Sequence, residues 1–181
     1  MRFAGKAVTI RDGREAVLRA PDAGEALELL AFLRDTAEET EFLLRSPEEC
    51  TMTLDEERRF IGWINDSPDN MMIVCTVEGE LAGNCQISFM KKRKTMHRAS
   101  VAIALRRKFW GLGIGTMLMT ELVAAARERG IRQIELEFVE GNHRARALYE
   151  KLGFRLVGMR PNAYRLSDGG MRHEYIMVKE L

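Results

Sequence analysis

Three glycines at positions 111, 113 and 115 carry the first chemical signal in this sequence. They follow an apolar, strand-like segment, residues 101–105, and open a helical pattern that has no acidic residue at its start. The first turn of a helix has backbone N–H groups without partners, and glycines leave those groups accessible to a ligand. The spacing therefore predicts a site for a phosphate group.

The residues around these glycines do not match the two common nucleotide-binding turns. A nucleotide-triphosphate loop has lysine and then serine or threonine after its last glycine, whereas Thr116 follows Gly115 directly. A dinucleotide-binding turn needs a third glycine three residues after a Gly-x-Gly pair, where this chain has Thr116 and Leu118. The expected ligand therefore has a phosphate group but differs from the nucleotides that these two turns bind.

Asn142 and Tyr149 form a second chemical pair. Asn142 is well placed to cap a helix, and Tyr149 follows seven residues later, two turns along the same helical face. Both side chains can therefore point toward one ligand. Purely structural roles explain the same pattern: Asn142 as a helix cap and Tyr149 as a packed aromatic ring.

Residues 101–119 together with ELEFVEGNHRARALYEKLGF, residues 135–154, resemble the GCN5-related N-acetyltransferase (GNAT) family. The resemblance implies an α/β (α+β) fold with a mixed, mostly antiparallel central sheet of about seven strands flanked by four helices, as a single domain over residues 1–181. It also implies acetyl-CoA as the acetyl donor and no metal. One position departs from the family pattern: Trp110 stands where many members have glutamine or arginine.

The resemblance further implies which residues contact the cofactor. The end of the strand would pair with the pantetheine chain, and the backbone N–H groups of the glycine turn would hold the pyrophosphate. The implied contacts are Ile103, Ala104, Leu105, Gly111, Gly113, Ile114, Gly115, Thr116, Asn142 and Tyr149.

Acid and base candidates follow from the proton balance of acetyl transfer. An aliphatic amine of pKa about 10.4 costs about 4.6 kcal/mol to present as its free base at pH 7, so a base or a water chain is needed. Glu137 is the first candidate, ahead of Glu135, His143 and Glu41. Tyr149 is the candidate acid for the leaving thiolate. Since no serine or cysteine has a convincing catalytic partner in the sequence, direct transfer is expected.

The acceptor is expected to be a primary amine, either of a small molecule or of a peptide N-terminus. Three carboxylates after the first helix, Glu38, Glu39 and Glu41, are candidates for attracting it. A non-catalytic acyl-CoA sensor is the alternative function. A nucleic-acid role for Lys91–Lys94 is disfavoured because no aromatic residues interleave with the charges. A homodimer is possible.

Composition is that of an ordinary globular protein. The chain has 181 residues, of which 30% are charged, and its formal net charge is +1. It therefore lacks the overall excess of positive charge that favours binding to nucleic acid. No long apolar run or signal peptide is evident, so no membrane partner and a cytoplasmic location are expected. The three cysteines lack paired spacing, which disfavours a metal site or a disulfide framework.

Periodicity and turn residues predict the elements that would position these groups. The expected order is a hairpin or single strand around Asp12-Gly13, two helices, three strands, a helix, a strand, a helix and two strands. The expected segments are 8–11, 16–19, 21–37, 53–65, 71–77, 81–90, the strand with Val101, a helix from Gly115 to Gly130, 134–138, a helix from Asn142 to Gly153, 155–160 and 172–178.

Overall fold

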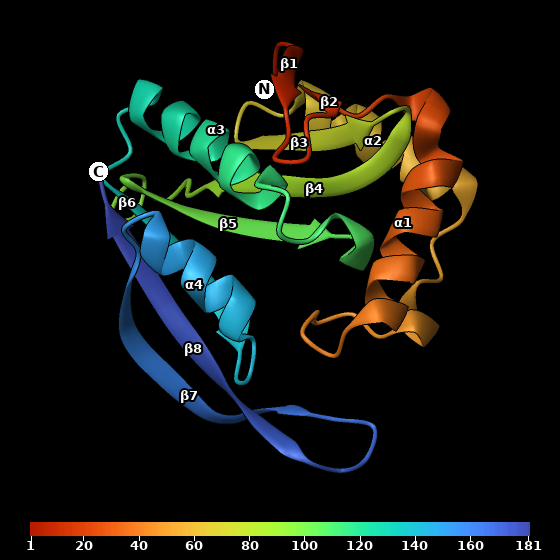
Figure 1. Ribbon diagram of the computed structural model, residues 1–181. Helices are drawn as coiled ribbons and strands as arrows, with labels where there is room; N and C mark the ends of the chain where they lie inside the picture. The colour runs from red at the N-terminus through yellow and green to blue at the C-terminus, as the bar shows by residue number, and fades with distance from the viewer.

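The computed structural model describes residues 1–181 and contains one mixed sheet with four α-helices (Figure 1). The strands are β1 (Lys6–Thr9), β2 (Glu15–Arg19), β3 (Asn70–Val77), β4 (Glu80–Phe89), β5 (Arg98–Leu105), β6 (Gln133–Val139), β7 (Arg155–Arg165) and β8 (Met171–Glu180). The helices are α1 (Ala26–Glu39), α2 (Leu54–Asp66), α3 (Ile114–Glu128) and α4 (His143–Lys151). Short 3₁₀ turns occupy Ala23–Glu25, Pro47–Glu49 and Arg107–Phe109.

The sheet has the strand order β1-β2-β3-β4-β5-β6-β8-β7. Every neighbouring pair is antiparallel except β5 and β6, which are parallel. The expected mixed, mostly antiparallel sheet with four helices is confirmed. It has eight strands rather than about seven, because the chain around Asp12 and Gly13 closes a true hairpin in which Val8 pairs with Ala16.

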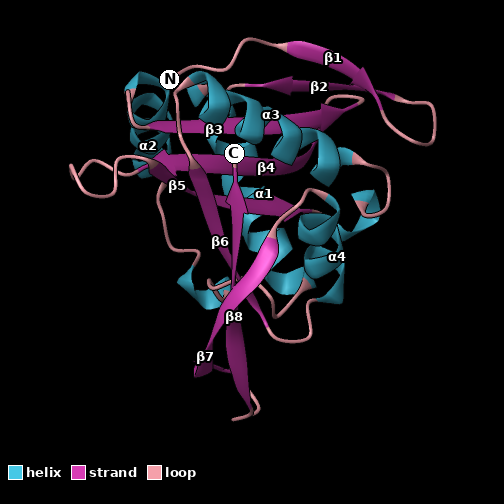
Figure 2. Cartoon of the chain, turned by 90° about the vertical axis from the view of Figure 1, so that its left-hand side faces the viewer, coloured by secondary structure: helices cyan, strands magenta, loops and turns pink.

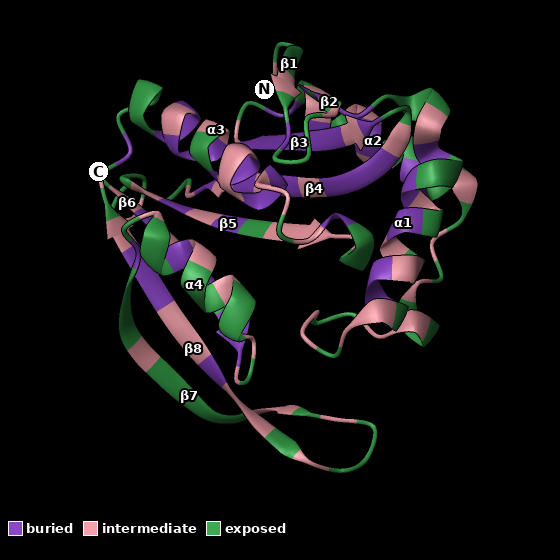
Figure 3. Ribbon diagram, viewed as in Figure 1, coloured by how far each residue is buried: buried purple, intermediate pink, exposed green.

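Helices cover both faces of the middle of the sheet. Strand β3 is almost wholly buried because alternate residues face opposite helices: Ile73 and Cys75 belong to the core beneath α3, and Val74 packs with Leu29 of α1 and Ile61 of α2. Figure 3 shows this central burial, in contrast to the exposed outer strand β7. The core thus fixes the strands that carry the candidate site.

Local signals set several element boundaries. Thr53 and Glu56 form the expected capping box at the start of α2, with the Thr53 side chain accepting from the Glu56 N–H. Glu78 and Gly79 both have positive φ, 51° and 83°, so the β3–β4 turn has the twist that suits a two-residue hairpin. These short-range interactions made the boundaries predictable.

The C-terminal hairpin of β7 and β8 extends away from the rest of the sheet (Figure 2). Its register shifts twice, between Leu156 and Gly158 and again between Arg160 and Tyr164. A bulge bends a strand and re-aims its side chains. Here the second bulge changes which residues of β7 face β8.

The basic run Lys91–Lys94 lies in the loop between β4 and β5. Because the glycine turn follows the far end of β5, the run and the turn are at opposite ends of that strand. Lys91 forms an ion pair with Asp69 at 3.0 Å. The run is therefore remote from the predicted phosphate site. None of the helices has the length and apolar character needed to cross a membrane.

Candidate active site

The glycine turn forms the start of α3 as the sequence predicts. Gly111 and Gly113 have φ values of 83° and 89°, in the left-handed region that favours glycine. Gly113 is the N-cap and offers no side chain to the first turn, which has no acidic residue. The N–H groups of this turn are therefore free of side-chain caps, as an anion site requires.

Gly115 is needed for a different reason, the close approach of neighbouring elements. A Cβ atom there would lie 3.1 Å from Leu148 of α4 and 3.3 Å from Leu105 of β5. These distances are tighter than ordinary van der Waals contact. The glycine thus allows the N-terminus of α3, the end of β5 and α4 to meet at one point.

Residues distant in sequence support the turn from outside. Arg11, in the β1–β2 loop, donates its backbone N–H to the Leu112 carbonyl at 3.0 Å and its side-chain Nη1 to the Gly111 carbonyl at 3.1 Å. The N–H of Arg107 donates to the carboxylate of Glu39, at the end of α1, at 2.5 Å. The loop that leads to the predicted phosphate site is fixed at both sides.

Strands β5 and β6 separate next to this turn. They pair only over three residues, from Arg98 with Gln133 to Ser100 with Glu135. The rest of β5, including the predicted Ile103, Ala104 and Leu105, keeps its partner β4 on one edge and has none on the other. Figures 1 and 2 show β6 and β8 running away from β5. This open edge suits an extended ligand with amide groups, because such a ligand can pair with it as a further strand.

Asn142 and Tyr149 lie on α4, at its start and near its end. The Asn142 side chain accepts from the Ala145 N–H at 3.1 Å, so its structural role as a cap is confirmed. Tyr149 is 6% exposed, and its ring lies 6.1 Å from that of Phe138 and 6.0 Å from that of Phe154, between ring centroids. Burial raises the pKa of Tyr149 to about 12, so the hydroxyl holds its proton at neutral pH.

Glu137 faces the opposite side of the sheet from Tyr149. It is exposed on β6, between Leu136 and Phe138, which point into the core beneath α3 and α4. No ion pair or hydrogen bond engages its carboxylate, whereas Glu135, another candidate base, is bound by Arg98. His143, also exposed, opens α4.

A polar cluster that sequence reasoning missed lies close to Glu137. Glu174 of β8 is 4% exposed and binds Arg160 through one carboxylate oxygen and the Tyr164 hydroxyl through the other. Burial raises the pKa of Tyr164, and so do its hydrogen bond to Glu174 and the negative charges of Glu174 and Glu137. No sequence signal marks this cluster, because the bulge that aims Tyr164 at Glu174 follows from strand register rather than from a motif.

The acidic segment at the end of α1, which includes Glu38 and Glu39 in the last turn of the helix, is largely engaged by arginines. Glu38 pairs with Arg34 at 3.1 Å, and Glu39 binds Arg107. Glu41 is exposed and is the member of the three without an ion pair. Among the predicted acceptor residues, Glu41 is therefore the one with a free carboxylate.

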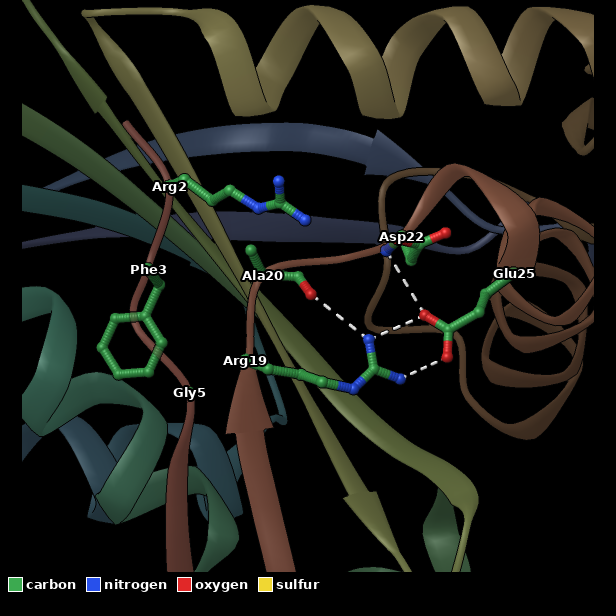
Figure 4. Close-up of a pocket in the computed structure, with 7 residues that line it drawn as sticks. All are labelled: Arg2, Phe3, Gly5, Arg19, Ala20, Asp22 and Glu25. Atoms are coloured by element: carbon green, nitrogen blue, oxygen red, sulfur yellow. Dashed lines mark hydrogen bonds and ion pairs between the residues drawn. The ribbon is translucent and has the colours of Figure 1, made fainter.

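A separate hollow of about 420 Å³ lies near the N-terminus and shares no residue with this site. Figure 4 shows part of its lining bound together: Arg19 pairs with Glu25 and donates to the Ala20 carbonyl at 3.2 Å, and the Asp22 N–H donates to Glu25 at 3.3 Å. These charges neutralise each other. Arg2 also lines the hollow and takes part in no ion pair or hydrogen bond, so the hollow has one unpaired charged group but no uncapped helix start like that of the glycine turn.

The acetyltransferase (GNAT) family model matches residues 30–154. Over 76 residues the chain is 37% identical to a ribosomal protein bS18-alanine N-acetyltransferase of Haemophilus influenzae, covering 42% of this chain and 51% of that protein. Over 114 residues it is 30% identical to a streptothricin acetyltransferase of Streptomyces lavendulae, covering 62% and 58%. The chain thus spans about half the length of the curated relatives it matches. The crystal structure of a GNAT-family acetyltransferase from Streptococcus pneumoniae has a TM-score of 0.86 at 25% identity, covering 92% of this chain and 99% of that one.

Proposed function

The chain belongs to the acetyltransferase (GNAT) family, and we propose that it transfers the acetyl group of acetyl-CoA directly to a primary amine. The observation that carries the proposal is the junction of two features: a strand edge left open from Val101 to Leu105, and an uncapped helix start at Gly113 directly beyond it. One end of this junction suits amide groups and the other suits phosphates. Acetyl-CoA has both in one chain.

The residues present fit this cofactor. The open edge at Ile103, Ala104 and Leu105 would pair with the pantetheine amides, and the turn from Gly111 to Thr116 would hold the pyrophosphate through backbone N–H groups. Bound acetyl-CoA supplies an activated acetyl thioester. The side-chain amide N–H₂ group of Asn142 stays free for a contact, since only its oxygen is used in the cap.

Two side chains would carry out the proton transfers. Glu137, exposed and unpaired, would take the proton of the acceptor ammonium on one side of β6. Tyr149, protonated at neutral pH, would give its proton to the departing sulfur on the other side. The base would therefore reach the acceptor amine from one face of the sheet, and the acid would reach the leaving thiolate from the other face. This arrangement needs no covalent enzyme intermediate.

We infer further that the acceptor is the N-terminal amine of a peptide or protein. An α-amine of pKa about 8 costs about 1.4 kcal/mol to deprotonate at pH 7, against about 4.6 kcal/mol for a lysine-like amine. A single exposed carboxylate such as Glu137 suits the smaller of these two deprotonation free energies, which is that of the α-amine. The similarity to a bS18-alanine N-acetyltransferase is consistent with this acceptor class. Because another relative is a streptothricin acetyltransferase, the experiment below also includes small-molecule amines.

The test measures thiol release from acetyl-CoA with two peptides of matched sequence. One has a free N-terminus and no lysine, and the other has a blocked N-terminus and one lysine; polyamines and aminoglycosides complete the panel. We expect turnover on the free N-terminus, reduced by Tyr149→Phe. Turnover only on lysine or on a small molecule would refute the acceptor class but keep acetyl transfer. Tight binding of acetyl-CoA without turnover on any amine would favour the sensor function instead. The homodimer and the cytoplasmic location stay predictions.

A further inference from the structure

Trp110, the residue that departs from the family pattern, is held firmly at the entrance to the glycine turn. Its indole N–H donates to the Leu105 carbonyl at 2.9 Å, at the end of β5. The ring is half-buried. It therefore presents a fixed aromatic face beside the predicted phosphate site.

Two arginines lie over this ring from different elements. The guanidinium carbon of Arg144, in the first turn of α4, is 5.1 Å from the ring centroid, and that of Arg107 is 5.6 Å away. The guanidinium of Arg107 already donates to the backbone carbonyl of Glu39. Arg144 is exposed and takes part in no ion pair or hydrogen bond, so all its N–H donors are free.

The helix geometry brings Arg144 toward the glycine turn. Leu148 is the α4 residue that a Cβ on Gly115 would meet at 3.1 Å. Arg144 precedes Leu148 by four residues and so shares its helix face, one turn nearer the start of α4. The free guanidinium and the uncapped start of α3 therefore border the same space.

The charges around this space favour an anion. The first turn of α3 has no acidic residue, and Arg11, hydrogen-bonded to the Gly111 carbonyl, has no carboxylate partner. By contrast, Arg146, two residues beyond Arg144 on α4, pairs with Glu150 at 2.8 Å. Arg144 thus differs from its helical neighbour in having an unbalanced charge directed at the turn.

We propose that Arg144 binds a phosphate group of the cofactor and that Trp110 is the positioning residue that holds it there. The proposal rests on the function proposed above. A guanidinium stacked on an aromatic face keeps its N–H edge free for a phosphate, which it can bind through two parallel hydrogen bonds. In this chain, the stacked pair would then supply positive charge beside the glycine turn, although position 110 itself has none.

Calorimetric binding of CoA tests this without turnover. Arg144→Gln is expected to weaken CoA binding about tenfold, the loss typical of one charge-assisted hydrogen bond. The matched control, Arg146→Gln, removes a paired charge from the same helix and is expected to change affinity less than about twofold. Titration of 3′-dephospho-CoA separates the two sources: an equal loss for both ligands assigns the contact to the pyrophosphate, and a loss for CoA alone assigns it to the 3′-phosphate.

The role of Trp110 is tested by coupling. Trp110→Leu should weaken CoA binding, and Arg144→Gln added to it should cost much less than Arg144→Gln alone. Trp110→Phe keeps an aromatic face and should retain most of the affinity. Additive losses would overturn the positioning role, and equal effects of Arg144→Gln and Arg146→Gln would overturn the phosphate contact. In both cases CoA binding by the unmodified protein would leave the proposed function standing, whereas failure of that binding would refute the function itself.

Discussion

Replacing Tyr149 by phenylalanine is expected to separate catalysis from stability. The ring is packed between Phe138 and Phe154, and phenylalanine can keep these contacts. Burial alone accounts for the raised pKa of the hydroxyl, which has no hydrogen-bond partner in the protein. Removing a hydroxyl that makes no hydrogen bond within the protein should leave the free energy of unfolding unchanged or raise it by up to about 1 kcal/mol. Turnover should fall by about 10²- to 10⁴-fold, the usual contribution of a general acid.

The same variant has a second signature at alkaline pH. The pKa of Tyr149 is about 12 in the folded protein, against about 10 in an unfolded chain. The unfolded state therefore loses this proton first, so the stability is fully present below about pH 10 and falls as the pH rises toward 12. At pH 11 the difference is one pH unit, or about 1.4 kcal/mol. Tyr149→Phe should not suffer this loss.

Urea unfolding of both proteins at pH 8 and pH 11, together with thiol-release kinetics at pH 8, measures both effects. Other groups titrate alike in the two proteins, so the difference between them isolates Tyr149. An equal alkaline loss of stability in both proteins would show that the hydroxyl is solvated. Unchanged turnover on an accepted amine would show that Tyr149 is not the acid.

Three further changes have expected outcomes. Glu137→Gln should lower turnover by about 10²-fold or more at unchanged calorimetric affinity for CoA, because the exposed carboxylate has no structural partner; a weakened CoA affinity would argue against a base. Glu174→Gln should lower the urea-derived free energy of unfolding by about 1–3 kcal/mol, since it weakens the buried bonds to Arg160 and Tyr164, and a loss below about 0.5 kcal/mol would contradict this. Gly113→Ala should lower the free energy of unfolding by about 1–2 kcal/mol, because φ is 89° at this position. Gly62→Ala should raise it by about 0.5–1 kcal/mol, because Gly62 lies inside α2 with no atom near its Cβ. Thermal unfolding that ranks the two variants alike would refute this argument from backbone conformation.

The parts of the fold that the sequence predicted well depend on neighbours in the chain. The Thr53–Glu56 capping box, the Glu78-Gly79 turn and the glycine turn each join residues a few positions apart, so their types and spacing suffice. The same holds for Asn142 as a cap. These motifs also contain most of the predicted cofactor residues, and for that reason the phosphate end of the site was recognisable.

The acceptor side was less predictable because its contacts join distant segments. Glu39 is expected from sequence to attract the acceptor, yet it holds the N–H of Arg107, 68 positions away. Tyr164 meets Glu174 only because β7 shifts register after Arg160. A shift of register changes which side chains face each other without altering the hydrophobic pattern that sequence analysis reads.

Hydrogen exchange with and without acetyl-CoA tests the central claim most directly, because it reports on the backbone groups that would hold the cofactor. We expect acetyl-CoA to slow amide exchange from Val101 to Leu105, along the open edge of β5, and from Gly111 to Thr116, in the glycine turn. The β1–β2 strands should be unaffected outside the Arg11 loop. Unchanged exchange in both segments at saturating acetyl-CoA would contradict the account.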